Sequence, residues 1–110
     1  MGKVYTFFYL HREALFYSIG GFVANQLDSD PSDWSKTSDE LIQILGLRSS
    51  KCVLVIEETG WGVVPATQLG GLFRDRLGQL AQQLERIADV SWLVLQGRAV
   101  DLRSISHPVP

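Results

Sequence analysis

Residues 52–56 form an uninterrupted apolar run, Cys-Val-Leu-Val-Ile, and this run constrains the fold more than any other feature. A strand with one wet face alternates apolar with polar residues, but this run has no polar position. Continuous apolar strands are typical of parallel sheets that helices cover on both faces. We therefore expect residues 51–58 to form a buried strand in an α/β sheet.

The segment after this strand carries the longest helical pattern. Apolar residues recur every three or four positions over residues 69–88, and Thr67 is the candidate N-cap. Arg74, Asp75 and Arg76 are expected on the opposite, solvated side of this helix. Glycine inside a helix costs about 1 kcal/mol relative to alanine and often marks close packing or a backbone approach. The glycines in question are Gly70, Gly71 and Gly78.

Two short runs precede this unit. Residues 4–10 are rich in β-branched and aromatic residues and predict a strand, and residues 14–19 form a second apolar run that ends at a glycine pair. Two interpretations stay open for this region. One is a pair of adjacent strands, and the other is a single strand preceded by an N-terminal leader.

The remaining elements are shorter. Residues 22–27 predict one or two helical turns, and a helix should follow the polar linker 28–33, with Asp33, Ser35 or Ser38 as its cap. After the long helix, residues 90–95 predict another strand and residues 100–105 a short strand or turn. Residues 107–110 are expected to be a frayed tail.

The order strand, helix, strand, helix, strand predicts a small, mostly parallel α/β sheet with right-handed crossovers. A chain of 110 residues suits a single domain. The net charge of −2 without a basic tract argues against a nucleic-acid partner, and no apolar run is long enough to cross a membrane. The single cysteine, Cys52, cannot form an internal disulfide, which favours a reducing, cytoplasmic location.

The loop after the buried strand is the best candidate for a site, because α/β proteins bind ligands outside the carboxyl ends of their strands. Glu57 and Glu58 could hold a magnesium ion through water or accept hydrogen bonds from a nucleotide sugar. Gly60 and Gly62 would permit close approach of the backbone to a ligand. From periodicity alone, a plain connection with two solvated acids is an equally good interpretation.

Other constellations are weaker. Arg74 and Asp75 could clamp a phosphate or pair with a neighbouring element, although a solvated helix face is commoner. Neither histidine has metal-ligand spacing to other candidate ligands, so no metal site is predicted. The sequence contains no GxxxxGK[S/T] phosphate-binding loop and no GxSxG nucleophile motif.

The motifs EETGWGVVP, LGGLFRDRLG and WLVLQG occur in this order and, together, are fairly specific. Residues 14–105 resemble the C-terminal part of the bifunctional adenosylcobinamide kinase / adenosylcobinamide-phosphate guanylyltransferase family. The matching positions are Glu57, Glu58, Gly60, Gly62, Val64, Pro65, Phe73, Arg74, Asp75, Gly78 and Gly97, with Asn25 in the earlier stretch SIGGFVANQL.

The resemblance implies a truncated RecA-like P-loop NTPase-type fold, with three layers and a mostly parallel sheet. It also implies a role in cobalamin biosynthesis, in which the family phosphorylates adenosylcobinamide and then transfers GMP from GTP through a guanylylated histidine. GTP or ATP with Mg would be the cofactors, and cobinamide or a nucleotide the ligand. The implied nucleotide- or substrate-binding residues are Glu57, Glu58, Gly60, Gly62, Arg74 and Asp75.

The sequence also departs from the family pattern. The P-loop and the histidine that accepts GMP are missing, and Tyr17 stands where the family has a magnesium-linked aspartate. Gly71 replaces a frequent arginine, and Ala81 a frequent asparagine. Residues 1–13 form an atypical leader that matches nothing in the family, and residues 106–110 form a tail.

We therefore expect no catalytic residues and a chain that is inactive as an enzyme on its own, because phosphoryl transfer depends on the missing charges. The alternatives are a non-catalytic interaction module and one half of a split enzyme. The exposed sheet edge of a half-fold would favour a homo-oligomer or pairing with an N-terminal fragment.

Overall fold

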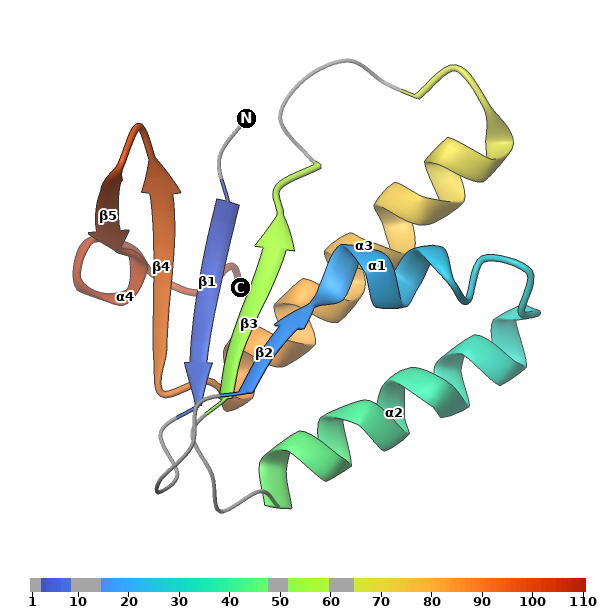
Figure 1. Cartoon of the computed structure of the whole chain (residues 1–110), viewed down its shortest axis with the longest axis horizontal. Helices are drawn as coiled ribbons and strands as arrows, with labels where there is room; N and C mark the ends of the chain where they lie inside the picture. The colour runs from blue at the N-terminus through green and yellow to red at the C-terminus, as the bar shows by residue number, and fades with distance from the viewer. Residues whose placement is uncertain (1–2, 9–14, 48–51, 60–64) are drawn as a thin grey trace.

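The computed structural model describes residues 3–8, 15–47, 52–59 and 65–110. Within these ranges strands and helices are distributed along the whole chain (Figure 1), as expected for a mixed α/β protein. The elements are β1 (Lys3–Phe8), β2 (Leu15–Ser18), α1 (Ile19–Ala24), α2 (Pro31–Leu47), β3 (Cys52–Glu57), α3 (Gln68–Ile87), β4 (Val90–Leu95), β5 (Arg98–Asp101) and α4 (Leu102–Ile105).

The strands form one sheet in the order β2-β3-β1-β4-β5. Only β2 and β3 pair in parallel, whereas β1 is antiparallel to both β3 and β4, and β4 is antiparallel to β5. The prediction of a mostly parallel sheet is therefore wrong. The apolar run of β3 correctly indicated burial, but burial does not determine the direction of a neighbouring strand.

Two local causes explain the antiparallel pairs. Gln96 and Gly97 have φ values of 51° and 73° and form a two-residue loop between the paired residues Leu95 and Arg98. Two successive positive φ angles are typical of the tight turn of a hairpin, which forces β5 to run against β4. At the centre of the sheet, β1 lies between β3 and β4. The strands expected over residues 4–10 and 14–19 correspond to β1 and β2, and these are not paired with one another because they lie on opposite sides of β3.

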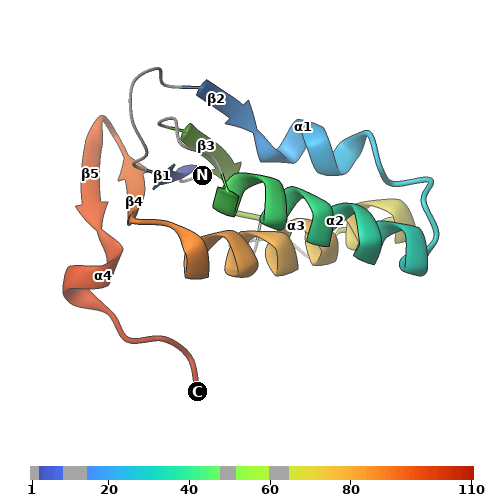
Figure 2. The same ribbon diagram turned by 90° about the horizontal axis from the view of Figure 1, so that it is seen from below.

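The helices are gathered on one side of the sheet. Figure 2 shows α2 and α3 below the strands, with α1 extending from the end of β2. None of the described helices covers the opposite face, where Trp92 is 38% exposed. Within the described residues, the expected third layer is therefore absent, and the predicted three-layer arrangement is wrong for this part of the chain.

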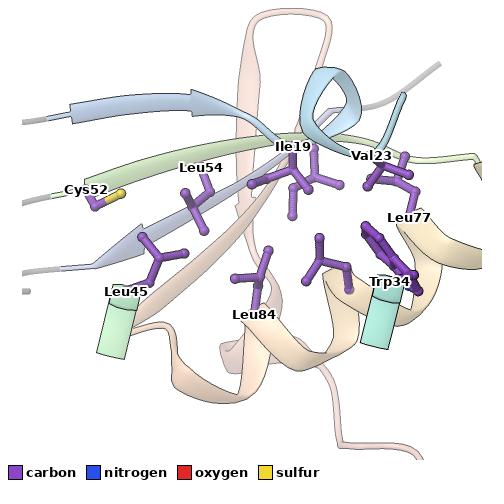
Figure 3. Close-up of a cluster of buried hydrophobic side chains, with 10 residues drawn as sticks. Ile19, Val23, Trp34, Leu45, Cys52, Leu54, Leu77 and Leu84 are labelled. Carbon is purple, nitrogen blue, oxygen red and sulfur yellow. The ribbon is translucent and has the colours of Figure 1, made fainter. Parts of the chain in front are cut away.

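The core lies between β3 and the three larger helices (Figure 3). Cys52, Leu54 and Ile56 point from alternate positions of β3 into a cluster of side chains from α1, α2 and α3. This alternation follows from the period of two in a strand. The remaining buried members are Ile19, Val23, Trp34, Leu45, Leu77, Leu80 and Leu84.

Helix α3 matches the predicted long helix and is fixed at both ends. The Thr67 hydroxyl accepts a hydrogen bond from the Gly70 amide at 2.9 Å, which confirms the predicted N-cap. At the other end, Arg103 donates from Nε to Glu85 Oε1 at 2.8 Å and from Nη1 to the Asp89 carbonyl at 3.2 Å. A cation at a helix C-terminus also interacts favourably with the helix dipole.

The prediction for Arg76 is wrong, because its side chain is only 4% exposed. It donates to the carbonyls of Gln26 at 2.8 Å and Ser29 at 2.7 Å, and its guanidinium lies 5.3 Å from the centroid of the Trp34 ring. These contacts tie α3 to the connection between α1 and α2. A buried guanidinium is stable here because its donors meet carbonyl acceptors.

Helix α2 begins earlier than predicted. Its first residue is Pro31, and Asp30 Oδ1 accepts a hydrogen bond from the Asp33 amide at 2.8 Å. Asp30 is therefore the cap, and the predicted caps Asp33, Ser35 and Ser38 lie inside the helix. Proline suits the first helical position, since its φ is already helical and its missing N–H is not needed there.

In the part of the chain that the structure describes, no helix is long and apolar enough to cross a membrane.

Candidate functional site

The carboxyl end of β3 faces the middle of α3, and two neighbouring depressions lie along this contact. Both are lined by Glu58 and Thr59 from the end of the strand and by Gly78 and Gln82 from the helix. The strand supplies its residues as it leaves the sheet, and the helix supplies residues from successive turns of one face. The predicted position of a site, outside the end of a buried strand, is thus a real concave surface.

The first depression has a volume of about 420 Å³, and its lining is about equally polar and apolar. Arg74 and Asp75 join it from the second turn of α3, with Arg74 Nη2 lying 3.5 Å from Asp75 Oδ1. The Asp75 side chain is 65% exposed, so water strongly screens this ion pair. The structure therefore places Glu58, Arg74 and Asp75 around one depression.

The second depression has a volume of about 250 Å³ and a more apolar lining. Glu57, Glu58 and Glu85 lie around it, and its apolar part is made by Ile56, Leu77, Ala81 and Leu102. A ligand with an apolar body and several hydrogen-bond donors would suit such a surface. A bare anion would not, because Glu57 and Glu58 would repel it.

Gly20 controls where the carboxylate of Glu57 lies. A Cβ atom built on Gly20, the second residue of α1, would lie 2.2 Å from Glu57 Oε2. The carboxylate therefore occupies space that any other residue at position 20 would fill. Sequence reasoning treated Gly20 only as the end of an apolar run and missed this contact, which joins residues far apart in the chain.

The glycines of α3 are not equivalent. A Cβ atom on Gly70 would lie 3.0 Å from Pro65 Cβ and from Thr67 Oγ1, so close packing explains this glycine. A Cβ atom on Gly71 or Gly78 would meet no heavy atom within 4 Å. Gly78 differs from Gly71 because it lines both depressions, whereas Gly71 lines neither.

Gln79 and Gln82 are further lining residues that sequence reasoning missed. Gln79 lies four residues after Asp75, and Gln82 lies three residues after Gln79, so all three share one face of the helix. This spacing was readable from the sequence, but glutamines on a solvated face carry no specific signal. The predicted site residues Gly60 and Gly62 lie outside the described residues.

A magnesium ion carrying a nucleotide is compatible with the residues present. Within the described ranges, no group of three or more histidine, cysteine, aspartate and glutamate side chains is arranged so that it could hold a metal ion by itself. Magnesium is usually held by one or two carboxylates together with substrate phosphates. Glu58 and Asp75, which line the same depression, provide such a pair.

Comparisons with known proteins give a consistent result. A family model described as cobinamide kinase / cobinamide phosphate guanyltransferase matches residues 9–102. The chain is 35% identical over 98 residues to the bifunctional adenosylcobalamin biosynthesis protein CobU of Salmonella typhimurium, covering 81% of this chain and 51% of that protein. It is 36% identical over 85 residues to the protein of the same name from Escherichia coli, covering 69% of this chain and 47% of that protein. The chain thus spans about half the length of the curated relatives it matches.

Proposed function

Because the chain belongs to the cobinamide kinase / cobinamide phosphate guanyltransferase family, we propose that it binds a nucleotide or cobinamide for the modification of cobinamide in cobalamin biosynthesis. The observation that carries this proposal is the contact between the carboxyl end of β3 and α3. There Glu58, Arg74 and Asp75, which the family motifs single out, line one depression. The nucleotide would be GTP or ATP with magnesium, and the reactions phosphorylation followed by transfer of GMP.

Each residue has a distinct role in this proposal. Glu58 and Asp75 would hold the magnesium ion of the nucleotide, and the charge of that ion would offset the repulsion between these carboxylates and the phosphates. Arg74 donates to a phosphate oxygen, and Glu57 accepts from a ligand hydroxyl or amide. By the family resemblance, Gly60 and Gly62 would permit close approach of the backbone to the ligand.

The proposed role is that of a binding half-site. Phosphoryl transfer requires cations that stabilise the charge on the transferred group, and the 110 residues contain no GxxxxGK[S/T] pattern to supply the usual lysine. We infer that this chain alone does not phosphorylate cobinamide. The coverage of about half of each relative favours one further role, that of a module whose site is completed by a second segment.

Isothermal titration calorimetry of GTP, ATP and cobinamide, each with and without magnesium, tests the proposal. Binding of at least one ligand is expected, and Gly78→Leu should weaken it by about tenfold or more because the new side chain fills both depressions. Gly71→Leu is the matched control, since position 71 is equally open but lines neither depression. If none of the ligands binds, or if both variants bind like the wild-type chain, the proposed site is wrong.

Gly20→Ala tests the position of Glu57 without touching the ligand. The added methyl group should push the Glu57 carboxylate aside, and the flexible end of that side chain can move at little cost to stability. Ligand affinity should therefore fall in Gly20→Ala but not fall further in the double variant Gly20→Ala/Glu57→Gln than in Glu57→Gln alone. Additive losses would show that Gly20 acts in some other way.

A further inference from the structure

The centre of the sheet is filled by a strand that lies outside the family match. The matched region begins at residue 9, whereas β1 consists of Lys3–Phe8. Yet β1 pairs along its whole length with β3 on one side and, through five of its residues, with β4 on the other. In Figure 1 it runs between these two strands and opposite to both.

The two strands around β1 are tied together independently of it. Since each is antiparallel to β1, β3 and β4 run in the same direction, and α3 connects them across one face of the sheet. Neighbouring strands lie about 4.8 Å apart, so β3 and β4 are separated by the width of one strand. Without β1, two facing rows of backbone N–H and C=O groups would lack partners in the middle of the sheet.

None of the other described strands can fill this position. Strands β2 and β5 form the two outer edges, and each is already paired with its inner neighbour. Buried backbone groups without hydrogen bonds are strongly disfavoured. A family chain with the same β3-α3-β4 unit but no counterpart of residues 3–8 must therefore fill the position from another part of its sequence.

We propose that the space between β3 and β4 is a strand-binding site, which β1 occupies in this protein. The same site accepts an extended segment from the part of a family chain that this protein does not match. This inference rests on the proposed function, because it names the surface through which a second segment would complete the half-site. Its ligand is an extended segment free of internal proline that offers backbone donors and acceptors on both sides. Strand addition of this kind gains its affinity from main-chain hydrogen bonds.

The inner position is a better acceptor than either outer edge. The edge strands β2 and β5 have four residues each, whereas β3 and β4 have six each and would bind a segment from both sides. The relatives contain about as much chain again as this protein matches, which is ample for one strand. A segment entering there must displace β1, so the two occupants exclude one another.

Hydrogen exchange on the intact wild-type chain is the first test. The amides of residues 3–8 should be protected to the same degree as those of 52–57, as expected for a central strand. Free exchange of residues 3–8 beside a protected β3 overturns the proposal. This measurement needs no variant, so it does not depend on any altered chain folding.

The second test uses overlapping synthetic peptides that tile the part of the Salmonella typhimurium relative outside the match. Thr6→Pro removes a backbone donor from β1 and should loosen this strand. Gln68→Pro is the matched control, because position 68 is the first residue of α3 and Thr67 before it is already extended at φ −117° and ψ 154°.

One peptide should bind Thr6→Pro about tenfold or more tightly than it binds Gln68→Pro or the wild-type chain. At saturation on the wild-type chain, it should raise exchange at residues 3–8 while residues 52–57 and 90–95 stay protected. Equal affinity for all three chains, binding of no peptide, or binding that leaves residues 3–8 protected overturns the proposal. The nucleotide titration is a separate measurement. If no nucleotide binds, the proposed function fails, but the peptide can still replace β1 and the strand-binding site would stand.

Discussion

Helix α3 has two flanks in different surroundings. On the flank toward α1 and α2, Arg76 is 4% exposed and its guanidinium donates to two carbonyls of the connection before α2. On the flank toward the end of β3, the Asp75 side chain is 65% exposed and Gly78 leaves open space. Adjacent residues of one helix, Asp75 and Arg76, thus differ in their exposure to solvent.

The difference separates stability from binding. Groups on the packed flank are desolvated and fully engaged, so their loss leaves cavities or unsatisfied partners. Groups on the open flank contact water and could exchange it for a ligand at little cost to the fold. Substitutions on the two flanks should therefore differ in their effect on unfolding even when the residue type is the same.

The largest effect is expected for Leu80→Ala. Leu80 is completely buried in the core, so its truncation should lower the free energy of unfolding by about 3 to 4 kcal/mol. Urea denaturation measures this loss. Leu69→Ala, at a position that is 58% exposed on the same helix, is the control and should change stability by less than about 0.5 kcal/mol. Similar losses of unfolding free energy in both variants would mean that Leu80 is no more buried than Leu69.

Arg76→Ala should destabilise the protein by about 2 to 3 kcal/mol, because the carbonyls of Gln26 and Ser29 would lose a charged donor. Arg74→Ala, two residues earlier on the open flank, should change the unfolding free energy by less than about 0.5 kcal/mol. Thermal and urea unfolding of both variants provide the comparison. If Arg74→Ala were the more damaging, the assignment of the two flanks would be reversed.

Asp30→Ala should cost about 1 kcal/mol, since Asp30 caps the helix that Arg76 ties to α3. The neighbouring Asp28, which is exposed, is the control. Hydrogen exchange at the first turn of α2 should increase in Asp30→Ala and stay unchanged in Asp28→Ala. Equal increases in exchange in both variants would mean that the negative charge of the linker, and not the hydrogen bond to Asp30, stabilises the first turn of α2.

The smallest effect, and the only stabilising one, is expected on the open flank. Gly78→Ala and Gly71→Ala should each raise the free energy of unfolding by up to about 1 kcal/mol, because alanine favours the helix and its methyl group meets no atom. Gly70→Ala should gain nothing, since its Cβ atom would press on Pro65 and Thr67. Calorimetric melting temperatures of the three variants test this order. Equal gains at all three positions would contradict it.

Elements with strong local patterns were predictable from the sequence. The apolar run of β3, the three-to-four spacing of α3 and its Thr67 cap all depend on residues close together in the chain. The start of α2 was also local but was misplaced, because several residues near Pro31 can cap a helix and only the observed bond from the Asp33 amide to Asp30 distinguishes them.

The features that failed depend on distant partners. Arg76 is buried because its acceptors, Gln26 and Ser29, lie about fifty residues earlier, and a helical pattern does not reveal them. The direction of the strands was missed because β1 inserts between β3 and β4. In the site, only the family resemblance grouped Glu58 with Arg74 and Asp75, because no local pattern connects the strand end to the helix.

Among the glycines, one residue that adjoins the site was missed, and two predicted residues lie outside the described part of the chain. Gly20 was missed because its role depends on the Glu57 carboxylate, which no local pattern connects to it. Gly60 and Gly62 remain predictions.

The central position of β1 also has a consequence for the order in which the protein folds during synthesis. Tyr5 pairs with Val55 and with Trp92, so β1 cannot complete its pairing until the ribosome has synthesised the chain through β4. Contacts so distant in sequence slow folding, because a long loop must close first. Until β4 emerges, one edge of the nascent sheet stays open, and we expect this interval to be when a newly made chain is most prone to aggregate.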